Sequence, residues 1–249
     1  MITNEDSLFQ DYSKKHVHFY DEECPAFLEL GLALISDVNR RSIVDLGCGD
    51  GRLLFALHKK GFLNSFSEIV GVDISAKRIE RLTKELPFVK GIVSDASNVK
   101  LPDSSFDYII CSQVIEHVQD DDALVAEIKR FLKNGGVAYI SSVIKHWYAV
   151  YFYYNNGSFR LDPTHAREYS SANEFVSLLQ ARGFEVIDVK TRQVMFPLLD
   201  LLLRLFVKFG LMEADSGFFR NHKFLGKIRK LRIPVVGYKS VEVLVRKIE

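Results

Sequence analysis

Short apolar runs alternate with segments of helical periodicity along most of this chain. The runs are rich in Val and Ile, which is typical of buried strands, and we predict strands at 42–46, 68–73, 88–93, 106–111, 137–142, 184–190 and 241–246. Apolar residues at helical spacing predict helices at 52–60, 75–84, 121–132 and 171–182. Such alternation predicts an α/β fold with a doubly wound, mostly parallel sheet of about seven strands.

Capping residues mark several helix ends. Ser75 is a predicted N-cap, and Ser171 with Glu174 three residues later has the spacing of a capping box. Gly135 and Gly136 are predicted to end the helix that begins at 121.

Residues 1–249 contain no internal repeat and no low-complexity linker, so we predict a single domain. Residues 1–40 are predicted to form an N-terminal helical cap. Residues 191–236 form a predicted helical insertion before the last strand, with an apolar helix near 197–210. That helix can pack on the domain's own core, cover a substrate pocket, form a homodimer contact or lie in a membrane interface.

Composition and charge narrow the class of protein. The chain is 47% hydrophobic with a formal charge of +1, which is typical of a globular domain. Residues 220–249 hold nine of its 33 Lys and Arg residues but only two of its 32 acidic residues. This basic segment predicts contact with an anionic surface, and a solvated face is the open alternative.

The cysteine content and the lack of recognisable targeting segments predict where in the cell the protein is located. The three cysteines fit a reducing compartment, and neither a signal peptide nor an apolar run long enough to span a membrane is recognisable. A cytoplasmic location is therefore predicted, with peripheral membrane association through 197–232 as an alternative.

A glycine-rich turn follows the first predicted strand, in the string Asp45-Leu46-Gly47-Cys48-Gly49-Asp50-Gly51. Glycine lets a backbone turn tightly and approach a ligand closely. Asp73 ends the next strand, where a carboxylate can accept hydrogen bonds from ribose hydroxyls. Arg52 occupies a position where the dinucleotide fingerprint needs a small residue, and no phosphate-binding G-x-x-x-x-G-K-[ST] is present. These features predict a nucleoside-bearing cofactor that is neither a dinucleotide nor a triphosphate.

Three further motifs follow in order: Ser94-Asp95-Ala96, the string from Phe106 to Val118 that contains Ser112-Gln113 and Glu116-His117, and Lys133-Asn134-Gly135-Gly136. With the glycine-rich turn, this series resembles the class I S-adenosylmethionine-dependent methyltransferases. Within that family it resembles the ubiquinone/menaquinone-biosynthesis-like small-molecule branch, over roughly residues 40–190. The resemblance implies S-adenosylmethionine as the cofactor and a Rossmann-like sheet.

The resemblance also implies site residues by position. Asp45 would help to hold the amino group of the cofactor, Asp73 the ribose hydroxyls and Asp95 the adenine amino group. For Asp73 and Asp95, a turn-capping role is the alternative. The implied cofactor-binding residues are Asp45, Gly47, Cys48, Gly49, Gly51, Asp73, Ile74, Asp95, Ala96, Ser112 and Gln113.

His117 and His165 are the candidate catalytic residues. Methyl transfer depends mainly on alignment, but a hydroxyl acceptor must also lose its proton, and histidine titrates near neutrality. For His117, a structural role at a helix entrance is equally open. Some relatives hold a divalent ion with Glu-x-x-Glu-His, but Gln113 stands at the first position here. We therefore predict no metal site.

The acceptor is predicted to bind at 146–169, a segment rich in aromatic residues with a turn at 155–157. Residues 164–169 resemble a segment that lies near the acceptor pocket in this methyltransferase branch. The candidate substrate-binding residues are Trp147, Tyr151, Arg167 and Tyr169. The alternative is that Arg167 pairs with Glu168 and that Tyr169 packs in the core.

The leading hypothesis is methyl transfer to a small molecule, and the favoured acceptor is an oxygen of a hydrophobic metabolite or a lipid-linked sugar. An RNA or protein methyltransferase is the first alternative. It is disfavoured because Ser112-Gln113-Val114 replaces the Asn-Pro-Pro-Tyr type of motif and no RNA-binding module is recognisable, so nucleic acid is not an expected partner. A non-catalytic, cofactor-binding scaffold is the second alternative.

Overall fold

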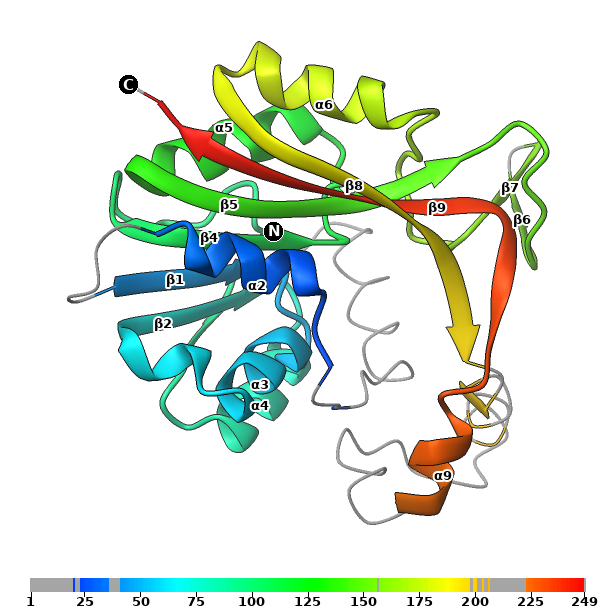
Figure 1. The fold of residues 1–249 in the computed structure, drawn as a ribbon, viewed down its shortest axis with the longest axis horizontal. Helices are drawn as coiled ribbons and strands as arrows, with labels where there is room; N and C mark the ends of the chain where they lie inside the picture. Colours follow the sequence, from blue (N-terminus) through cyan, green and yellow to red (C-terminus); the bar gives the residue numbers. More distant parts are fainter. Residues whose placement is uncertain are drawn as a thin grey trace.

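The computed structural model describes Tyr20 and residues 23–35, 41–155, 157–197, 199–200, 203, 206 and 223–248. Seven strands of this part form one sheet in the order β3-β2-β1-β4-β5-β9-β8 (Figure 1). They are β1 (Arg41–Leu46), β2 (Phe66–Asp73), β3 (Lys90–Val93), β4 (Phe106–Ser112), β5 (Leu132–Lys145), β8 (Phe184–Pro197) and β9 (Arg232–Lys247). The helices are α2 (Ala26–Ala33), α3 (Arg52–Lys59), α4 (Ala76–Glu85), α5 (Asp121–Phe131), α6 (Ala172–Ala181), α9 (Lys223–Ile228) and the 3₁₀ helix η1 (Phe62–Ser65).

Strands β1 to β5 pair in parallel, whereas β9 runs antiparallel between β5 and β8. The doubly wound, mostly parallel α/β sheet is therefore confirmed. The strand order moves outward from β1 to β3 and then returns to β4 on the other side of β1. Ligands of such sheets bind at the carboxyl ends of the strands beside this change of direction. The glycine-rich turn after β1 and the end of β4 both lie there.

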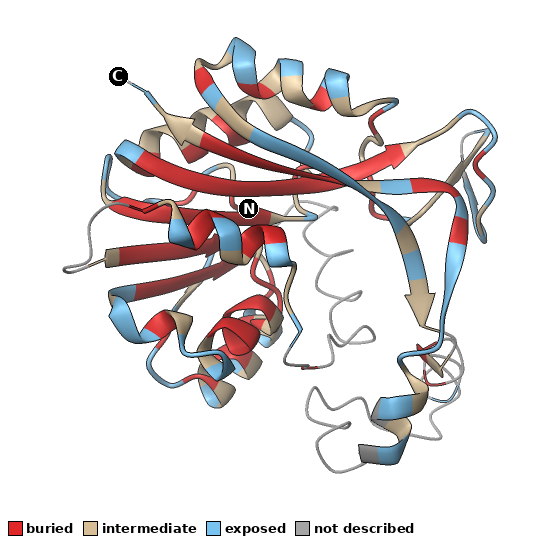
Figure 2. Cartoon of the chain, in the orientation of Figure 1, coloured by how far each residue is buried: buried red, intermediate tan, exposed pale blue. Residues whose placement is uncertain are grey.

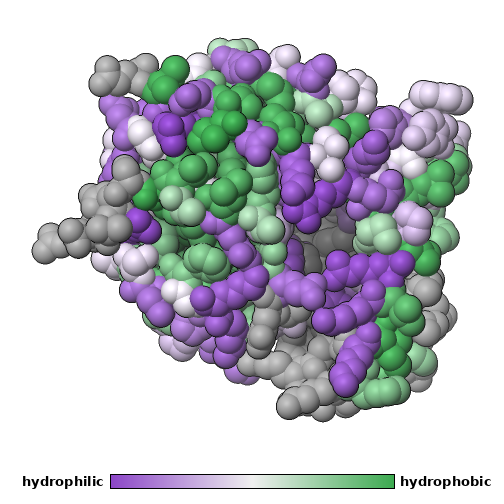
Figure 3. Space-filling model, viewed as in Figure 1, coloured by the Kyte–Doolittle hydropathy of each residue, from purple (hydrophilic) through white to green (hydrophobic). Residues whose placement is uncertain are grey.

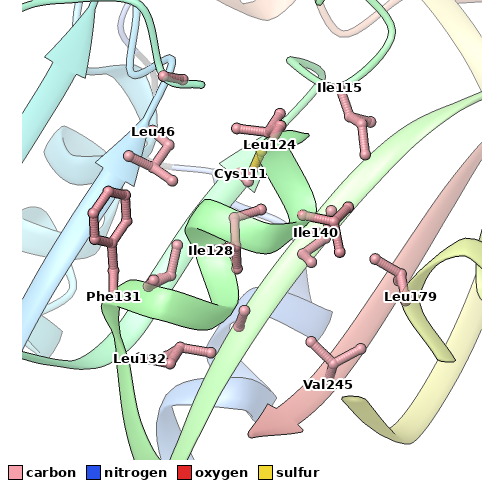
Figure 4. Close-up of a cluster of buried hydrophobic side chains, with 14 of the residues drawn as sticks. Leu46, Cys111, Ile115, Leu124, Ile128, Phe131, Leu132, Ile140, Leu179 and Val245 are labelled. Atoms are coloured by element: carbon pink, nitrogen blue, oxygen red, sulfur yellow. The ribbon is translucent and has the colours of Figure 1, made fainter. Parts of the chain in front are cut away.

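Two hydrophobic clusters cover the two faces of the sheet. One contains side chains of α5 and α6, with Leu124, Ile128 and Phe131 of α5 fully buried (Figure 4). The other contains side chains of α2, α3 and α4. The parallel strands β1, β2, β4 and β5 are buried along most of their length, while the edge strand β3 and the outer half of β8 are not (Figure 2). The core therefore holds the carboxyl ends of β1, β2 and β4 in a fixed arrangement.

The last three strands of the sheet are longer than predicted. Leu132 pairs with Phe106 and the register then shifts, so 133–136 form an irregularity within β5 instead of a loop. Strands β8 and β9 pair as far as Pro197 and Arg232, so both ends of the predicted insertion are strand. Their outer halves contain apolar residues that form a small cluster of their own around Val235 and Tyr238. Pro197, Pro234 and Gly237 interrupt these runs, which argued against strands in the sequence.

A small hairpin follows β5 and was not predicted as strand. It consists of β6 (Tyr153–Asn155) and β7 (Ser158–Arg160), and Gly157 between them has φ +77°. The predicted turn at 155–157 thus joins these two strands. The predicted caps are also present: Ser75 Oγ accepts from the Arg78 N–H and Ser171 Oγ from the Glu174 N–H.

The predicted N-terminal cap and the predicted apolar helix of the insertion lie mostly outside the described residues. Of the predicted cap at 1–40, the structure describes Tyr20 and residues 23–35, which include α2. Of the apolar helix at 197–210, it describes residues 197, 199–200, 203 and 206. No helix in the described part of the chain is both long and apolar enough to cross a membrane.

Helix α2 fits closely against the sheet at Gly31, and a substitution there tests this contact. A Cβ at Gly31 would lie 2.3 Å from Tyr108 Oη, whose hydroxyl donates to the Leu28 carbonyl at 3.0 Å. Gly31→Ala is therefore expected to lower the free energy of unfolding in urea by about 1–3 kcal/mol, despite alanine's better helix propensity. Leu30→Ala, at a 46% exposed position of the same helix, should change it by less than about 0.5 kcal/mol. A Gly31→Ala protein as stable as the native chain would contradict the close packing.

Candidate functional site

A cavity of about 540 Å³ opens at the carboxyl ends of β1, β2 and β4. This volume lies within the range of small-molecule sites. Most of the implied cofactor residues line it: Asp45, Gly47, Cys48, Asp73, Ile74, Asp95, Ala96, Ser112 and Gln113. His117 lines it too, together with Asp162 and Thr164 from the segment after β7. The sheet thus brings together residues that are far apart in the sequence.

The three glycines of the turn all have left-handed backbones, with φ of +70°, +56° and +85° at Gly47, Gly49 and Gly51. Gly47 lines the cavity, and a Cβ there would lie 2.3 Å from Val114 Cγ2. A Cβ at Gly51 would instead lie 2.3 Å from Leu82 Cδ1 of α4. Gly51 is therefore needed for packing of the turn, whereas Gly47 shapes the cavity wall.

Asp73 ties the glycine-rich turn to the start of α4. Its Oδ2 accepts from the Gly49 N–H and its Oδ1 from the Ser75 N–H, both at 2.9 Å. Burial raises the pKa of this carboxyl, and Arg78 with the two N–H groups opposes that shift. Each carboxylate oxygen has a second lone pair, so Asp73 can hold the turn and still accept from a ligand hydroxyl.

Asp45 is a second buried carboxyl on the cavity wall. Burial, and then the neighbouring charge of Asp73, raise its pKa to about 8. Its Oδ2 is buried and has no hydrogen-bond partner among the described residues. Such an oxygen is costly unless a ligand pairs with it, and a cationic group such as the amino group of S-adenosylmethionine meets that need.

The lining residues that follow β2 and β3 suit a nucleoside base. Asp95 Oδ1 accepts from the Ser97 N–H at 2.8 Å, which is the turn-capping contact foreseen as its alternative role. Asp95 also lines the cavity beside Ile74 and Ala96, so capping and ligand contact are compatible. Arg52 and Arg78 line the cavity as well and were not selected from the sequence. The residues present therefore fit the implied cofactor from its amino group to its base.

Strand β4 ends in a strained backbone at the cavity wall. Gln113 has φ +56°, which is uncommon for a residue with a side chain. Its N–H donates to the Ser141 carbonyl at 3.0 Å, and Ser112 Oγ lies 3.0 Å from Ser141 Oγ. These contacts to β5 hold the unusual conformation, and such strain is often found at functional sites.

The two candidate catalytic histidines lie side by side, with ring centroids 4.7 Å apart. His117 Nδ1 lies 2.9 Å from Thr164 Oγ1 and 3.2 Å from the Thr164 carbonyl oxygen. Burial and the neighbouring His165 lower the pKa of His117 to about 4, so its ring is neutral near pH 7. His165 is buried behind it, outside the cavity lining, and its Nδ1 lies 2.8 Å from Glu168 Oε1.

Glu116 joins this pair and was not among the predicted site residues. It is fully buried, and its Oε2 accepts from Ser142 Oγ at 3.1 Å. Burial raises its pKa to about 7. The adjacent Glu-His dipeptide was visible in the sequence, but nothing there showed that His165 packs against it.

The predicted substrate-binding residues do not line the cavity. Tyr169 is buried and its hydroxyl donates to Asp121 Oδ2 at 2.8 Å. Arg167 forms an ion pair with the same Asp121, whereas Glu168 accepts from His165. The alternative pairing of Arg167 with Glu168 is therefore wrong, while burial of Tyr169 in the core is observed.

Trp147 and Tyr151 lie in an aromatic segment beside β9. Trp147 is 95% exposed, and the Tyr151 ring centroid lies 6.1 Å from that of Tyr238. Figure 3 shows hydrophobic residues along the right-hand edge of the molecule, where this region and the outer halves of β8 and β9 lie. Acceptor binding by Trp147, Tyr151, Arg167 and Tyr169 stays a prediction.

Residues 44–140 match a family model described as a methyltransferase domain. A probable S-adenosylmethionine-dependent methyltransferase of Mycolicibacterium smegmatis is 28% identical over 151 residues, which are 59% of this chain and 53% of that protein. An uncharacterized protein of Methanocaldococcus jannaschii is 24% identical over 84% of this chain and 95% of its own length. A ubiquinone biosynthesis O-methyltransferase of Rickettsia typhi is 26% identical over 43% of each chain. The chain thus spans about half the length of two of these three relatives.

Solved structures share the whole fold. The [4+2]-cyclase SpnF has a TM-score of 0.65 at 16% identity, covering 99% of this chain and 97% of its own. A putative methyltransferase from Bacillus halodurans has a TM-score of 0.62 at 15% identity, covering 90% of this chain and 100% of its own. At these identities the likeness shows the fold alone.

Proposed function

Because residues 44–140 match a methyltransferase domain and the relatives include a probable S-adenosylmethionine-dependent methyltransferase, we propose that this chain is a class I methyltransferase. It uses S-adenosylmethionine as its cofactor and methylates an oxygen of a small hydrophobic acceptor. The main observation in support is that the glycine-rich turn, Asp45, Asp73 and Asp95 all line the same cavity. The cofactor's sulfonium supplies an already activated methyl group. The protein's task is then to align donor and acceptor and to manage the acceptor's proton.

We assign the cofactor contacts from these positions. The orphaned Asp45 oxygen pairs with the amino group, Asp73 accepts from the ribose hydroxyls and Asp95 accepts from the adenine amino group. Gly47 keeps the wall open beside the methionine part. Ser112 and Gln113, at the end of β4, face the methyl-transfer side of the same cavity.

We place the acceptor on the side of His117, beyond Ser112 and Gln113. His117 is the one of the two candidate histidines that lines the cavity, and its neutral ring can accept a hydrogen bond from an acceptor hydroxyl. His165 lies directly behind it. This arrangement supports an oxygen acceptor, because a hydroxyl must pass its proton to a nearby base.

Peripheral membrane contact near 197–232 is a further proposal for delivery of a hydrophobic acceptor. Phe224 and Leu231 are 74% and 63% exposed, and Lys227 and Lys230 lie on the same segment. Exposed apolar groups beside basic residues favour an anionic lipid surface.

Calorimetry with S-adenosylhomocysteine tests the cofactor site. The native chain should bind it with a micromolar or lower Kd, and Asp73→Ala should weaken binding by about 10- to 100-fold, since charge-assisted hydrogen bonds are worth ~1.5–3 kcal/mol. The matched control is Asp103→Ala, at a 72% exposed carboxylate that pairs with Arg130, and it should bind like the native chain. Well-folded native protein that does not bind would overturn the assignment.

Transfer of a labelled methyl group from S-adenosylmethionine then tests the reaction. The panel contains phenolic or quinol rings, lipid-linked sugars, amines and RNA. Incorporation at an oxygen, lost in Asp73→Ala, is the expected result. Cofactor binding without transfer to any acceptor would contradict it and favour another use of this fold, since one neighbour is a [4+2]-cyclase.

A further inference from the structure

Arg78 differs from the other arginines in the part of the chain that the structure describes. Each of the others donates to a backbone carbonyl or lies in an ion pair with a carboxylate. The guanidinium of Arg78 makes no such contact among the described residues, and its Nε is buried. An arginine side chain carries five N–H donors and no acceptor, so it is unfavourable to bury part of it before an acceptor is present.

The position of Arg78 in helix α4 does not explain its charge. Arg78 follows Lys77 in the first turn, where the helix dipole disfavours cations. Lys77 compensates by pairing with Glu80 at 2.8 Å on the exposed side of the helix. Arg78 has no such pair among the described residues and instead lines the cavity together with Asp73 and His117. A ligand in the cavity gives this arginine a role that helix stability does not.

We propose that Arg78 binds an anionic group of the acceptor, so that the acceptor is a hydroxylated molecule that also carries a carboxylate or a phosphate. The inference rests on the proposed function and narrows its class of substrate. The planar guanidinium presents parallel N–H groups that match two oxygens of either anion.

The two arginines on the cavity wall act on different groups. Arg52 opposes the rise in the pKa of Asp45 that burial causes. Arg78 opposes the corresponding rise at Asp73, and it adds to the fall in the pKa of His117 that burial causes. Arg52 is therefore the cation beside the amino-acid part of the cofactor. Arg78 lies within electrostatic reach of both the ribose carboxylate and the acceptor side.

The acids near Arg78 have donors of their own. Asp73, Asp120 and Asp162 line the same cavity, and each accepts from a backbone N–H of its own turn or of the glycine-rich turn. None of them lies in an ion pair with Arg78 in the described structure. An anionic ligand among these acids is repelled unless a cation stands directly beside it, and Arg78 provides that cation.

This contact would select the acceptor as well as hold it. An acceptor without an oxyanion leaves the buried part of the guanidinium without a partner, and a site built to bind a polar group rejects analogues that lack it. A bidentate contact also limits rotation of the acceptor, which helps to align its hydroxyl with the methyl group. Arg78 is thus a specificity-determining residue for the proposed reaction.

The first experiment asks whether Arg78 binds the cofactor instead. Calorimetry on the full chain compares S-adenosylhomocysteine with 5′-methylthioadenosine, which has the same nucleoside but no amino-acid part. Arg78→Met should bind each of them within about threefold of the native chain. Weaker binding of S-adenosylhomocysteine alone would assign Arg78 to the cofactor carboxylate, and weaker binding of both would assign it to the nucleoside. Either result would overturn the proposal.

The second experiment measures the preference for an anion. Protein saturated with S-adenosylhomocysteine is titrated at low ionic strength with 4-hydroxybenzoate, phenyl phosphate and the neutral 4-hydroxybenzamide. The native chain should bind at least one of the two anions at least about tenfold more tightly than the amide. The tighter of the two anions identifies the group as a carboxylate or a phosphate.

Three variants attribute this preference to the guanidinium. Arg78→Met should lose it, while Arg78→Lys should retain part of it, because the ammonium keeps the charge but lacks the planar fork. Lys77→Met removes the neighbouring cation, whose side chain is 48% exposed, and should behave like the native chain.

The outcomes separate this inference from the proposed function. A native chain that binds S-adenosylhomocysteine but shows no preference for an anion would overturn the inference alone. So would a preference that Arg78→Met retains, and Arg78 would then only offset the charge of Asp73. A well-folded native chain that does not bind S-adenosylhomocysteine would overturn the proposed function and the inference together.

Discussion

Gly47→Ala is expected to abolish cofactor binding and to lower the free energy of unfolding by about 2–5 kcal/mol. Two causes add at this position. The backbone has φ +70°, which is unfavourable for any residue with a Cβ. The added methyl group would also lie 2.3 Å from Val114 Cγ2 and 3.0 Å from Val114 Cγ1. Val114 lines the cavity, so relief of the overlap must move the wall against which the cofactor lies.

Gly135→Ala is the matched control for this experiment. Gly135 has φ +79°, but a Cβ there meets no atom within 4 Å. It should therefore show only the backbone cost, about 1–2 kcal/mol, and bind S-adenosylhomocysteine like the native chain. The double variant Gly47→Ala/Val114→Ala should regain part of the binding, because the smaller alanine at position 114 removes the two methyl groups that the new Cβ would overlap. Native-like binding by Gly47→Ala would show that this wall does not touch the cofactor.

The inner strands of the sheet were predictable because they are buried on both faces. Strands β1, β2 and β4 each contain a short run of Val, Ile or other apolar residues, and their bounds were predicted within two residues. The outer halves of β8 and β9 could not be found in the same way. They contain apolar residues, but Pro197, Pro234 and Gly237 interrupt the runs, and these residues are typical of strand ends and turns.

The cofactor side of the site was predictable for a related reason. Parallel strands all end at one edge of the sheet, so residues at successive strand ends, such as Asp45, Asp73 and Asp95, must lie near one another. Turn chemistry then accounts for the glycines between them. Gly51 shows how far the sequence could predict this region. Its left-handed φ of +85° is expected for a glycine in a tight turn. Its close approach to Leu82 could not be predicted, because it depends on how α4 packs.

The acceptor side could not be derived from strand ends. His165 reaches Glu116 and His117 only because the segment after β7 folds back across the end of β4. The Glu116 carbonyl there accepts from the Ala166 N–H at 2.8 Å. Because Glu168 turns toward His165, Arg167 takes Asp121 as its partner instead. A loop of this kind has no periodicity from which its contacts could be inferred.

Cofactor affinity is expected to rise with pH between about 5.5 and 7.5, by a factor approaching ten for each pH unit. Asp45 is the cause, since burial and the charge of Asp73 raise its pKa from 3.8 to about 8. Below pH 8 the side chain of the free protein is mostly protonated. The cationic amino group of S-adenosylhomocysteine requires the ionised form, so binding must release a proton, and this becomes easier as the pH rises toward 8.

Asp45 should give the stability of the ligand-free protein a pH dependence of the opposite sign to that of cofactor affinity. Between pH 4 and pH 8 the unfolded chain has lost the Asp45 proton while the folded chain retains it. The unfolded state then binds fewer protons, so this residue makes stability fall as pH rises through that window. Asp45→Asn cannot ionise, and its unfolding free energy should therefore vary less with pH than that of the native chain.

Calorimetry at several pH values, in buffers of different ionisation enthalpy, measures both the affinity and the number of protons released. Near pH 6.5 we expect close to one proton for the native chain and none for Asp45→Asn, whose affinity should be lower and nearly independent of pH. Asp95 also lines the cavity but is assigned to the adenine amino group, so Asp95→Asn should weaken binding but keep the native pH dependence. An equal slope in the native chain and in Asp45→Asn would mean that another group takes up the proton and that the amino group does not pair with Asp45.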